Sequence, residues 1–114
     1  MQISKSEYML YLKHPAWLWI KKHAKHLMPS VDEALQARFD EGHSFEPLVE
    51  SLYPNLIRLG FNSYSEYLDM PNKTSETWEN GAVVVSQGRY ETECVTCISD
   101  IVRRDGDKFE LTEI

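Results

Sequence analysis

Two acidic residues near the end of the chain stand where they could bind one metal ion together. Asp100 lies in an apolar, β-branched stretch, and Glu113 lies in an alternating stretch that begins at Lys108. Between them, Asp105-Gly106 favours a tight hairpin turn. Folding of this hairpin would bring both carboxylates to similar heights, where they could share a hard cation such as Mg²⁺. Taken alone, the hairpin favours the alternative of two solvated carboxylates beside a turn.

Charge is distributed unevenly along the chain. The net charge of -6 disfavours non-specific phosphate binding by the surface as a whole. Residues 1–26, however, hold five lysines and one glutamate, and the remainder is strongly acidic. This asymmetry suits nucleic acid meeting one basic face, and it equally suits charge complementarity within the chain. The candidate nucleic-acid-binding residues are Lys5, Lys13, Lys21 and Lys22.

The first two thirds of the chain show helical patterns. Ser4 and Glu7 match a capping box, and Pro15 suits the first turn of a second helix. Gly42 and Pro47 disturb the longest pattern. The expected helices cover residues 5–13, 15–26, 31–53, 64–70 and 74–80, with a loop at residues 71–73.

After Gly81 the apolar period changes from helical to alternating. Residues 82–87 are expected to form one strand, and residues 89–103 a long second strand that leads into the hairpin. The sequence therefore predicts an α+β fold in a single domain of residues 1–114. N-terminal helices would pack on a small sheet of about three antiparallel strands built from residues 82–114.

Cys94 and Cys97 have the spacing of a metal knuckle. Within a strand, however, residues three apart point to opposite faces, and a structural zinc site needs four ligands. We expect two free thiols that bind no metal and form no disulfide with each other; a zinc site completed by a histidine is the alternative. The histidines concerned are His14, His23 and His26. Two cysteines without an export signal or a membrane-length apolar run indicate a cytoplasmic protein.

Several stretches together resemble the RecB-like branch of the PD-(D/E)XK nucleases, which includes the CRISPR-associated RecB-like exonucleases. They are the helices-then-strands order, the opening I-S-K-S-E-Y-M-L-Y-L-K-H-P-A-W-L-W-I, the run A-R-F-D-E-G-H-S-F and the hairpin. Within this branch, the Ala-Arg-Phe…Gly-His stretch is most similar to the N-terminal part of a group of uncharacterised bacterial proteins. The resemblance covers nearly all of this chain but only the front half of the family's domain, and it implies an incomplete restriction-endonuclease-like core.

The resemblance implies a metal-dependent nuclease that hydrolyses DNA. Mg²⁺ or Mn²⁺ would be held by His43, Asp100 and Glu113, with Asp100 and Glu113 as the catalytic carboxylates. Iron–sulfur members have a cysteine before the proline, where this chain has His14, so no cluster is implied. The family's lysine would follow Ile114 and is absent from the chain.

These features lead us to expect the N-terminal part of a longer protein, with weak metal binding and no detectable DNA cleavage by this part. No lysine is expected beside the carboxylates, because Lys108 lies about 20 Å along the strand. The free edge of the last strand predicts a homo-oligomer, through strand pairing or exchange of the terminal hairpin. A non-enzymatic module that binds nucleic acid or protein on the same scaffold is the alternative function.

Overall fold

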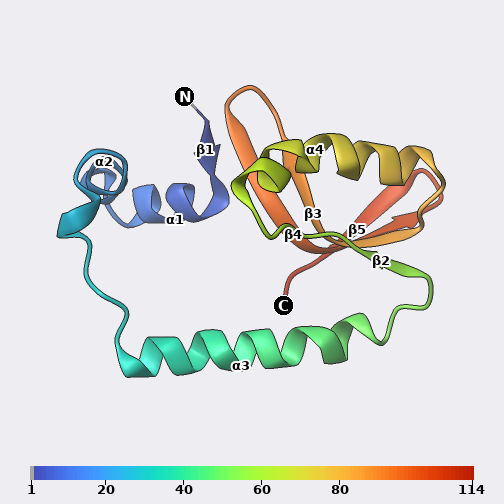
Figure 1. Cartoon of the computed structure of the whole chain (residues 1–114), viewed down its shortest axis with the longest axis horizontal. Coiled ribbons are helices and arrows are strands. Elements are labelled where there is room, and N and C mark those ends of the chain that lie inside the picture. The colour runs from blue at the N-terminus through green and yellow to red at the C-terminus, as the bar shows by residue number, and fades with distance from the viewer. Residues whose placement is uncertain (1) are drawn as a thin grey trace.

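The computed structural model describes residues 2–114 and shows helices beside a five-stranded mixed sheet, which confirms the α+β class (Figure 1). The strands are β1 (Ile3–Ser4), β2 (Leu56–Arg58), β3 (Val84–Glu91), β4 (Val95–Asp105) and β5 (Lys108–Thr112). The helices are α1 (Lys5–Lys13), α2 (Pro15–His23), α3 (Glu33–Glu50) and α4 (Tyr64–Glu79), with a short 3-10 helix at Lys25–Leu27. None of the helices is long and apolar enough to cross a membrane within residues 2–114.

The three predicted antiparallel strands are present as β3, β4 and β5. The turn between β4 and β5 uses Gly106 at a φ of 64°, as the Asp-Gly signal predicted. Two further strands run parallel to this core, β1 beside β4 and β2 beside β3. The sequence did not predict them, because strands of two and three residues are too short to show an alternating pattern.

The predicted long strand at residues 89–103 is wrong, because a tight turn divides it. The Thr92 amide donates to the Val95 carbonyl at 2.8 Å. The Thr92 hydroxyl oxygen accepts from the amides of Cys94 and Val95 at 3.3 and 3.2 Å. Such local side-chain bonds compete with strand pairing. Cys94 therefore lies in an exposed turn rather than in a strand, so the argument from strand alternation fails for it; both thiols are free.

The predicted loop at residues 71–73 is also wrong, because α4 continues through Pro71. Proline lacks the amide that would bond the carbonyl four residues earlier, which here belongs to Tyr67. Arg89 replaces that donor: its Nη1 lies 2.8 Å from the Tyr67 carbonyl oxygen. A side chain distant in sequence thus donates the hydrogen bond that the proline cannot donate.

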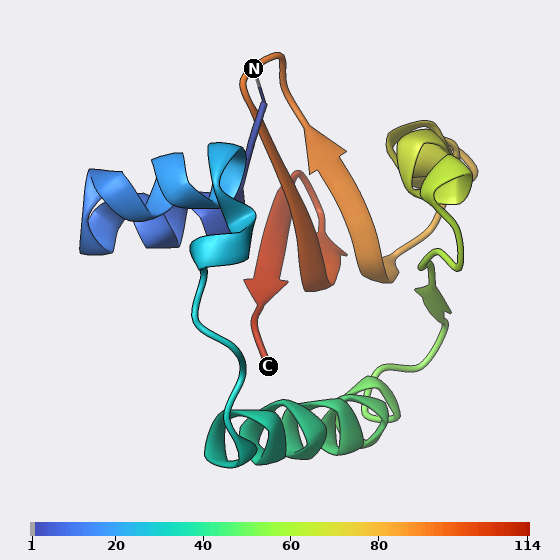
Figure 2. The same ribbon diagram turned by 60° about the vertical axis from the view of Figure 1, so that its left-hand side comes forward.

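The core is formed by α4 and the two central strands of the sheet. Met70 of α4, Val85 of β3 and Ile101 of β4 are almost completely buried. Helix α4 lies beside β3 (Figure 2). The guanidinium of Arg89 is also buried, with its central carbon 4.0 Å from the centre of the Tyr67 ring. Its Nε donates to the Thr96 hydroxyl at 2.9 Å, which joins α4, β3 and β4.

The first two helices follow the sequence closely. The capping box of Ser4 and Glu7 forms as predicted, and α1 covers the expected residues. The second helix ends at His23, three residues earlier than expected, and passes into the 3-10 helix. Lys22 reaches from α2 to Glu7 at 2.9 Å and fastens the two helices together.

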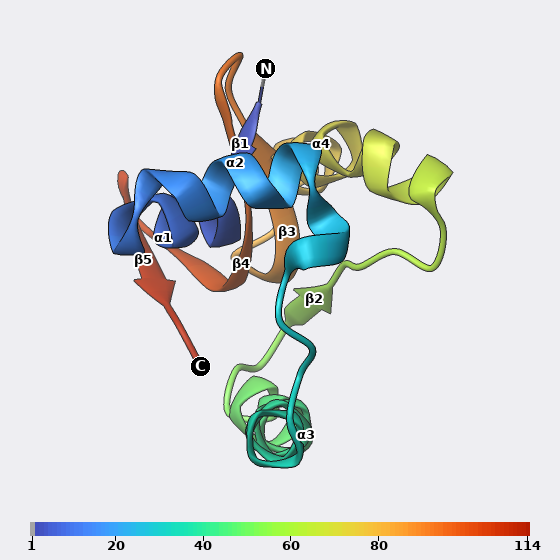
Figure 3. The same cartoon turned by 90° about the vertical axis from the view of Figure 1, so that its left-hand side faces the viewer.

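Helix α3 stands apart from the sheet and from α4 in all three views (Figures 1, 2 and 3). It runs unbroken through Gly42 and Pro47, and none of its residues is buried. A two-pronged hydrogen bond between Arg58 and Glu50 links its C-terminal end to β2. The sequence predicted that the N-terminal helices pack on the sheet. Helix α1 does contact β1 and β4, whereas α3 buries none of its residues.

Candidate carboxylate site at the C-terminal hairpin

The hairpin brings Asp100 and Glu113 together as its sequence predicts. Ile101 pairs with Thr112, and the same register places Asp100 opposite Glu113. Residues directly opposite on antiparallel strands share one face of the sheet. The amide of Ile114 donates to Oδ2 of Asp100 at 2.8 Å, which fixes this carboxylate beside the end of the chain.

Lys5 completes a small charged cluster with the two carboxylates. Its Nζ lies 2.5 Å from Oε2 of Glu113. This hydrogen bond raises the pKa of Lys5; burial opposes the rise, and the negative charges of Glu113 and Asp100 add to it. Both side chains are about half exposed, so water screens the pair and its contribution to stability is small. The pairing orients the ammonium group toward the carboxylates.

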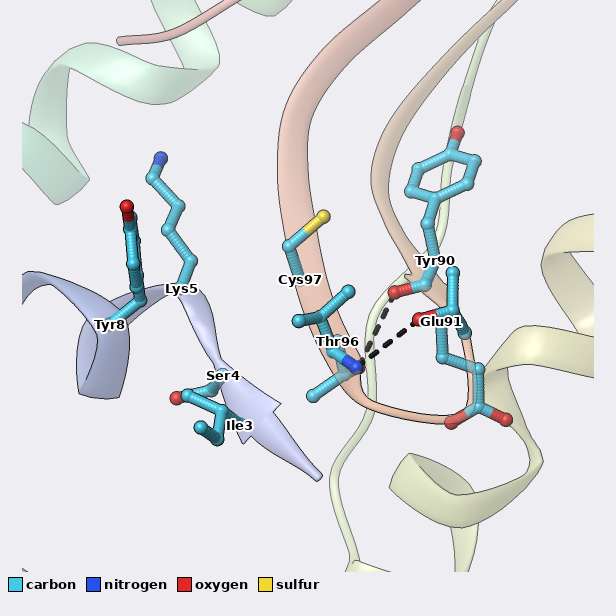
Figure 4. Close-up of a pocket in the computed structure, with 10 residues that line it drawn as sticks. Ile3, Ser4, Lys5, Tyr8, Tyr90, Glu91, Thr96 and Cys97 are labelled. Carbon is cyan, nitrogen blue, oxygen red and sulfur yellow. Dashed lines mark hydrogen bonds between the residues drawn. The ribbon is translucent and has the colours of Figure 1, made fainter. Parts of the chain in front are cut away.

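A cleft of about 380 Å³ opens beside this cluster, between the start of α1 and strand β4. Figure 4 shows Lys5 and Tyr8 projecting side by side from α1, across the cleft from Cys97. The remaining lining comes from the β3–β4 hairpin and from Ile3 and Ser4. The cleft shares Lys5 with the charged cluster, whereas neither Asp100 nor Glu113 lines it.

The structure does not bring His43 to the carboxylates. His43 lies on the exposed α3, and residues 2–114 contain no group of three or more potential ligands close enough to hold a metal ion. The three-residue ligand set implied by the family resemblance is therefore not assembled here. Two adjacent carboxylates alone still suit Mg²⁺, which usually keeps several waters and binds through one or two carboxylates.

The four predicted nucleic-acid-binding lysines occupy different environments. Lys5 pairs with Glu113, and Lys22 pairs with Glu7 and donates to the Gln2 carbonyl at 3.3 Å. Lys13 and Lys21 form no ion pair within residues 2–114 and remain available to an anion. The structure thus divides the predicted basic set into two engaged and two available side chains.

Two neighbours of the site were missed from the sequence. The expectation that no lysine lies beside the carboxylates is wrong, because pairing of β1 with β4 carries Lys5 to Glu113 across more than a hundred residues. Gln87 stands opposite Asp100 in the β3–β4 register and has a φ of 58°, a backbone conformation that few non-glycine residues adopt. Neither position carries a local sequence signal.

Comparison of the chain with known protein families, curated proteins and solved structures found no match in any of the three.

Proposed function

We propose that this chain is part of a cytoplasmic, metal-dependent nuclease that hydrolyses phosphodiester bonds in DNA. The observation that carries the proposal is the pairing of Asp100 with Glu113 across the hairpin, with the Lys5 ammonium at Glu113. Two carboxylates and a lysine are the groups that such hydrolysis uses to hold a cation and to meet the phosphate. The resemblance of the sequence to RecB-like nucleases supports the same class.

In this proposal Asp100 and Glu113 hold a hydrated Mg²⁺ or Mn²⁺. The bound cation would supply a water of lowered pKa and neutralise charge at the phosphate. The Ile114 amide donates to Oδ2 of Asp100 at 2.8 Å and Nε2 of Gln87 donates weakly to Oδ1 at 3.5 Å, and these bonds would hold the carboxylate in place beside the ion. His43 has no role in this two-carboxylate set.

Lys5 has a separate role at the mouth of the cleft. Its ammonium is compact, carries three donors and is half exposed. It can therefore keep one hydrogen bond to Glu113 and offer another to a phosphate oxygen. Preorganised donors of this kind stabilise charge that develops during reaction. Lys13 and Lys21 would bind the DNA backbone farther from the carboxylates.

The test is a titration of this chain with Mn²⁺, in which the electron paramagnetic resonance signal of the free ion measures how much Mn²⁺ is bound. Asp100→Asn and Glu113→Gln should each weaken binding by about tenfold or more, because either change removes one of two charged ligands. Glu110→Gln is the matched control, since Glu110 is an exposed acid on β5 that pairs with Arg103 instead. Binding by Asp100→Asn equal to that of the unmodified chain would contradict the proposal.

A second measurement separates Lys5 from the carboxylates. Lys5→Gln removes a competing cation and should leave Mn²⁺ binding intact or tighter, while it weakens binding of single-stranded DNA in the presence of Mn²⁺. A Lys5→Gln chain that loses Mn²⁺ as completely as Glu113→Gln would show that Lys5 only supports the hairpin.

A non-enzymatic interaction module is the second candidate function. It is favoured by the absence of a three-ligand cluster from residues 2–114 and by the engagement of Glu113 with Lys5. This alternative predicts DNA or protein binding that ignores divalent cations. DNA binding that is unchanged by Mn²⁺ and by Asp100→Asn would favour it over the nuclease.

A further inference from the structure

Three oxygen-bearing side chains lie in one row across three neighbouring strands. By the register of the flanking pairs, Gln87 of β3 stands opposite Asp100 of β4, and Asp100 stands opposite Glu113, just after β5. Residues opposite one another on paired strands share a face of the sheet, and neighbouring strands are about 4.8 Å apart. The row thus has its shortest side chain in the middle and a longer one on each side, so the outer two can both lean toward Asp100.

The side chain of Gln87 does lean toward Asp100. Its Nε2 lies 3.5 Å from Oδ1 of Asp100, which is a long hydrogen bond. The other carboxylate oxygen accepts from the Ile114 amide at 2.8 Å. Oε1 of Gln87 is bonded to the same carbon as Nε2, and within residues 2–114 it accepts no hydrogen bond and is not buried. An available amide oxygen therefore lies next to the carboxylate pair.

The backbone at Gln87 carries this side chain at an energetic cost. Its φ of 58° lies in the left-handed region, which glycine adopts freely and few other residues adopt. Non-glycine residues held in this way cluster at functional sites. The next residue, Gly88, packs closely on α4, because a Cβ there would lie 3.1 Å from Cγ2 of Thr74. That packing accounts for an unusual backbone at this point, but it does not require an amide side chain on Gln87.

We propose that Gln87 is the third protein ligand of the cation site formed by Asp100 and Glu113, binding through Oε1 while Nε2 keeps its bond to Asp100. The inference rests on the proposed function and adds to its ligand set. No third histidine, cysteine or acidic side chain of residues 2–114 joins the two carboxylates. Amide carbonyl oxygens are among the ligands that hard divalent cations accept. Because the amide is neutral, it adds a ligand without adding to the repulsion between the carboxylates.

Titration with Mn²⁺, read from the electron paramagnetic resonance signal of the free ion, tests the ligand role by removing the ligand. Gln87→Gly should raise the dissociation constant of Mn²⁺ by about threefold or more, which is less than the loss of a charged ligand should cost. Without metal, the urea midpoint of this variant should change little, because glycine relieves the positive φ but also gains freedom in the unfolded chain. The lost affinity would then not come from lost folding.

Gln87→Glu tests the same role by strengthening the ligand. The change keeps the side-chain length and replaces a neutral oxygen ligand by a charged one, so Mn²⁺ should bind about threefold or more tighter than to the unmodified chain. Without metal, three carboxylates in one row should lower the urea midpoint. Mn²⁺ should then raise this midpoint by more than it raises that of the unmodified chain. A residue that only supports the strand would show the lost stability without the gained affinity.

Gln36→Ala is the matched control, because Nε2 of Gln36 donates to Asp40 at 3.0 Å in the same kind of amide–carboxylate pair on α3. It should leave Mn²⁺ binding unchanged. Binding by Gln87→Gly equal to that of the unmodified chain would overturn the inference, and so would binding by Gln87→Glu that is no tighter than that of the unmodified chain.

Asp100→Asn, measured in parallel, separates this inference from the proposed function. If Asp100→Asn weakens Mn²⁺ binding and the Gln87 variants leave it unchanged, only the role of Gln87 fails. If Asp100→Asn also leaves binding unchanged, the proposed function fails together with it.

Discussion

Helices α3 and α4 have similar local features but differ in how much of each helix is buried. Both span four or more turns, both begin at a side-chain cap, and both contain an internal proline. Yet α4 contributes buried Met70 and Thr74 to the core, whereas α3 buries nothing. The difference teaches that local sequence specifies a helix here, and that distant partners decide where the helix sits.

Arg89 is the partner that α4 has and α3 lacks. It donates to the Tyr67 carbonyl that Pro71 leaves unpaired, and its amide donates to the Thr74 hydroxyl at 3.1 Å. In α3 the equivalent carbonyl, four residues before Pro47, belongs to His43 and receives no such donor within residues 2–114. The proline of α4 is therefore compensated by tertiary structure, and the proline of α3 is not.

The largest effect expected on this comparison comes from Arg89→Ala. The change leaves the Tyr67 carbonyl and the Thr96 hydroxyl without their donor. It also removes the ion-pair partner of Glu91. It should lower the free energy of unfolding by about 4 kcal/mol, because two acceptors lose their donor and the contact of the guanidinium with the Tyr67 ring is lost. Urea denaturation measures it, and a loss below about 1 kcal/mol would mean that Arg89 does not fasten α4.

The next largest difference is expected between truncation of a side chain in the core and truncation of one on α3, measured by the free energy of unfolding. Ile101 is completely buried, so Ile101→Ala should lower the free energy of unfolding by about 3 kcal/mol through lost burial and a new cavity. Phe39→Ala removes a larger side chain from α3 and should change the monomer's free energy of unfolding by less than about 0.5 kcal/mol. Equal losses in dilute protein would show that α3 packs on the sheet.

The two helix caps offer a smaller, matched comparison. The Ser63 hydroxyl accepts from the Glu66 amide at 3.1 Å, and the Asp32 carboxylate accepts from the Leu35 amide at 2.8 Å. Ser63→Ala should lower the global free energy of unfolding by about 1 kcal/mol. Asp32→Ala should instead reduce helix content and amide protection in α3 alone. A global loss in both variants would contradict the separation of the two regions.

The smallest effect expected is a pH dependence at the α1–α2 pair, which is neither buried like α4 nor free like α3. Burial of Glu7 opposes its ionisation, but hydrogen bonds from Lys22 and the Ser4 amide outweigh it and lower its pKa below the usual 4.5. Its contribution to stability is thus present above pH 4.5 and is lost as pH falls through the lowered pKa. Glu7→Gln should flatten the pH dependence of thermal unfolding in that range.

Much of the fold could be predicted from local signals. The capping box at Ser4, the hairpin turn at Gly106 and the change of period after Gly81 each depend on neighbouring residues, and each was found. The loop expected at Pro71 was wrong. The hydrogen bond that the proline cannot donate to the Tyr67 carbonyl comes from Arg89 of β3, which is distant in sequence. The division of the second strand at Thr92 was missed because a short turn inside an apolar stretch looks like a continuous strand.

The candidate site was predictable to the same extent. Asp100 and Glu113 are paired by a local hairpin, so their spacing predicts their meeting. Lys5 joins them through the pairing of two-residue β1 with β4, which leaves no periodic pattern in the sequence. The position of His43 depends on where α3 docks, which no local pattern in the sequence specifies.

The most direct test of the proposed function is to locate the bound cation by nuclear magnetic resonance. Mn²⁺ added in small steps to the ¹⁵N-labelled chain broadens the amide signals nearest to it. The account predicts that the amides of Asp100 and Ile114 broaden first, together with that of Lys5, and that Glu113→Gln abolishes the effect. Broadening that begins elsewhere, at the acidic turn of residues 105–107 or along α3, would contradict a metal site at the carboxylate pair.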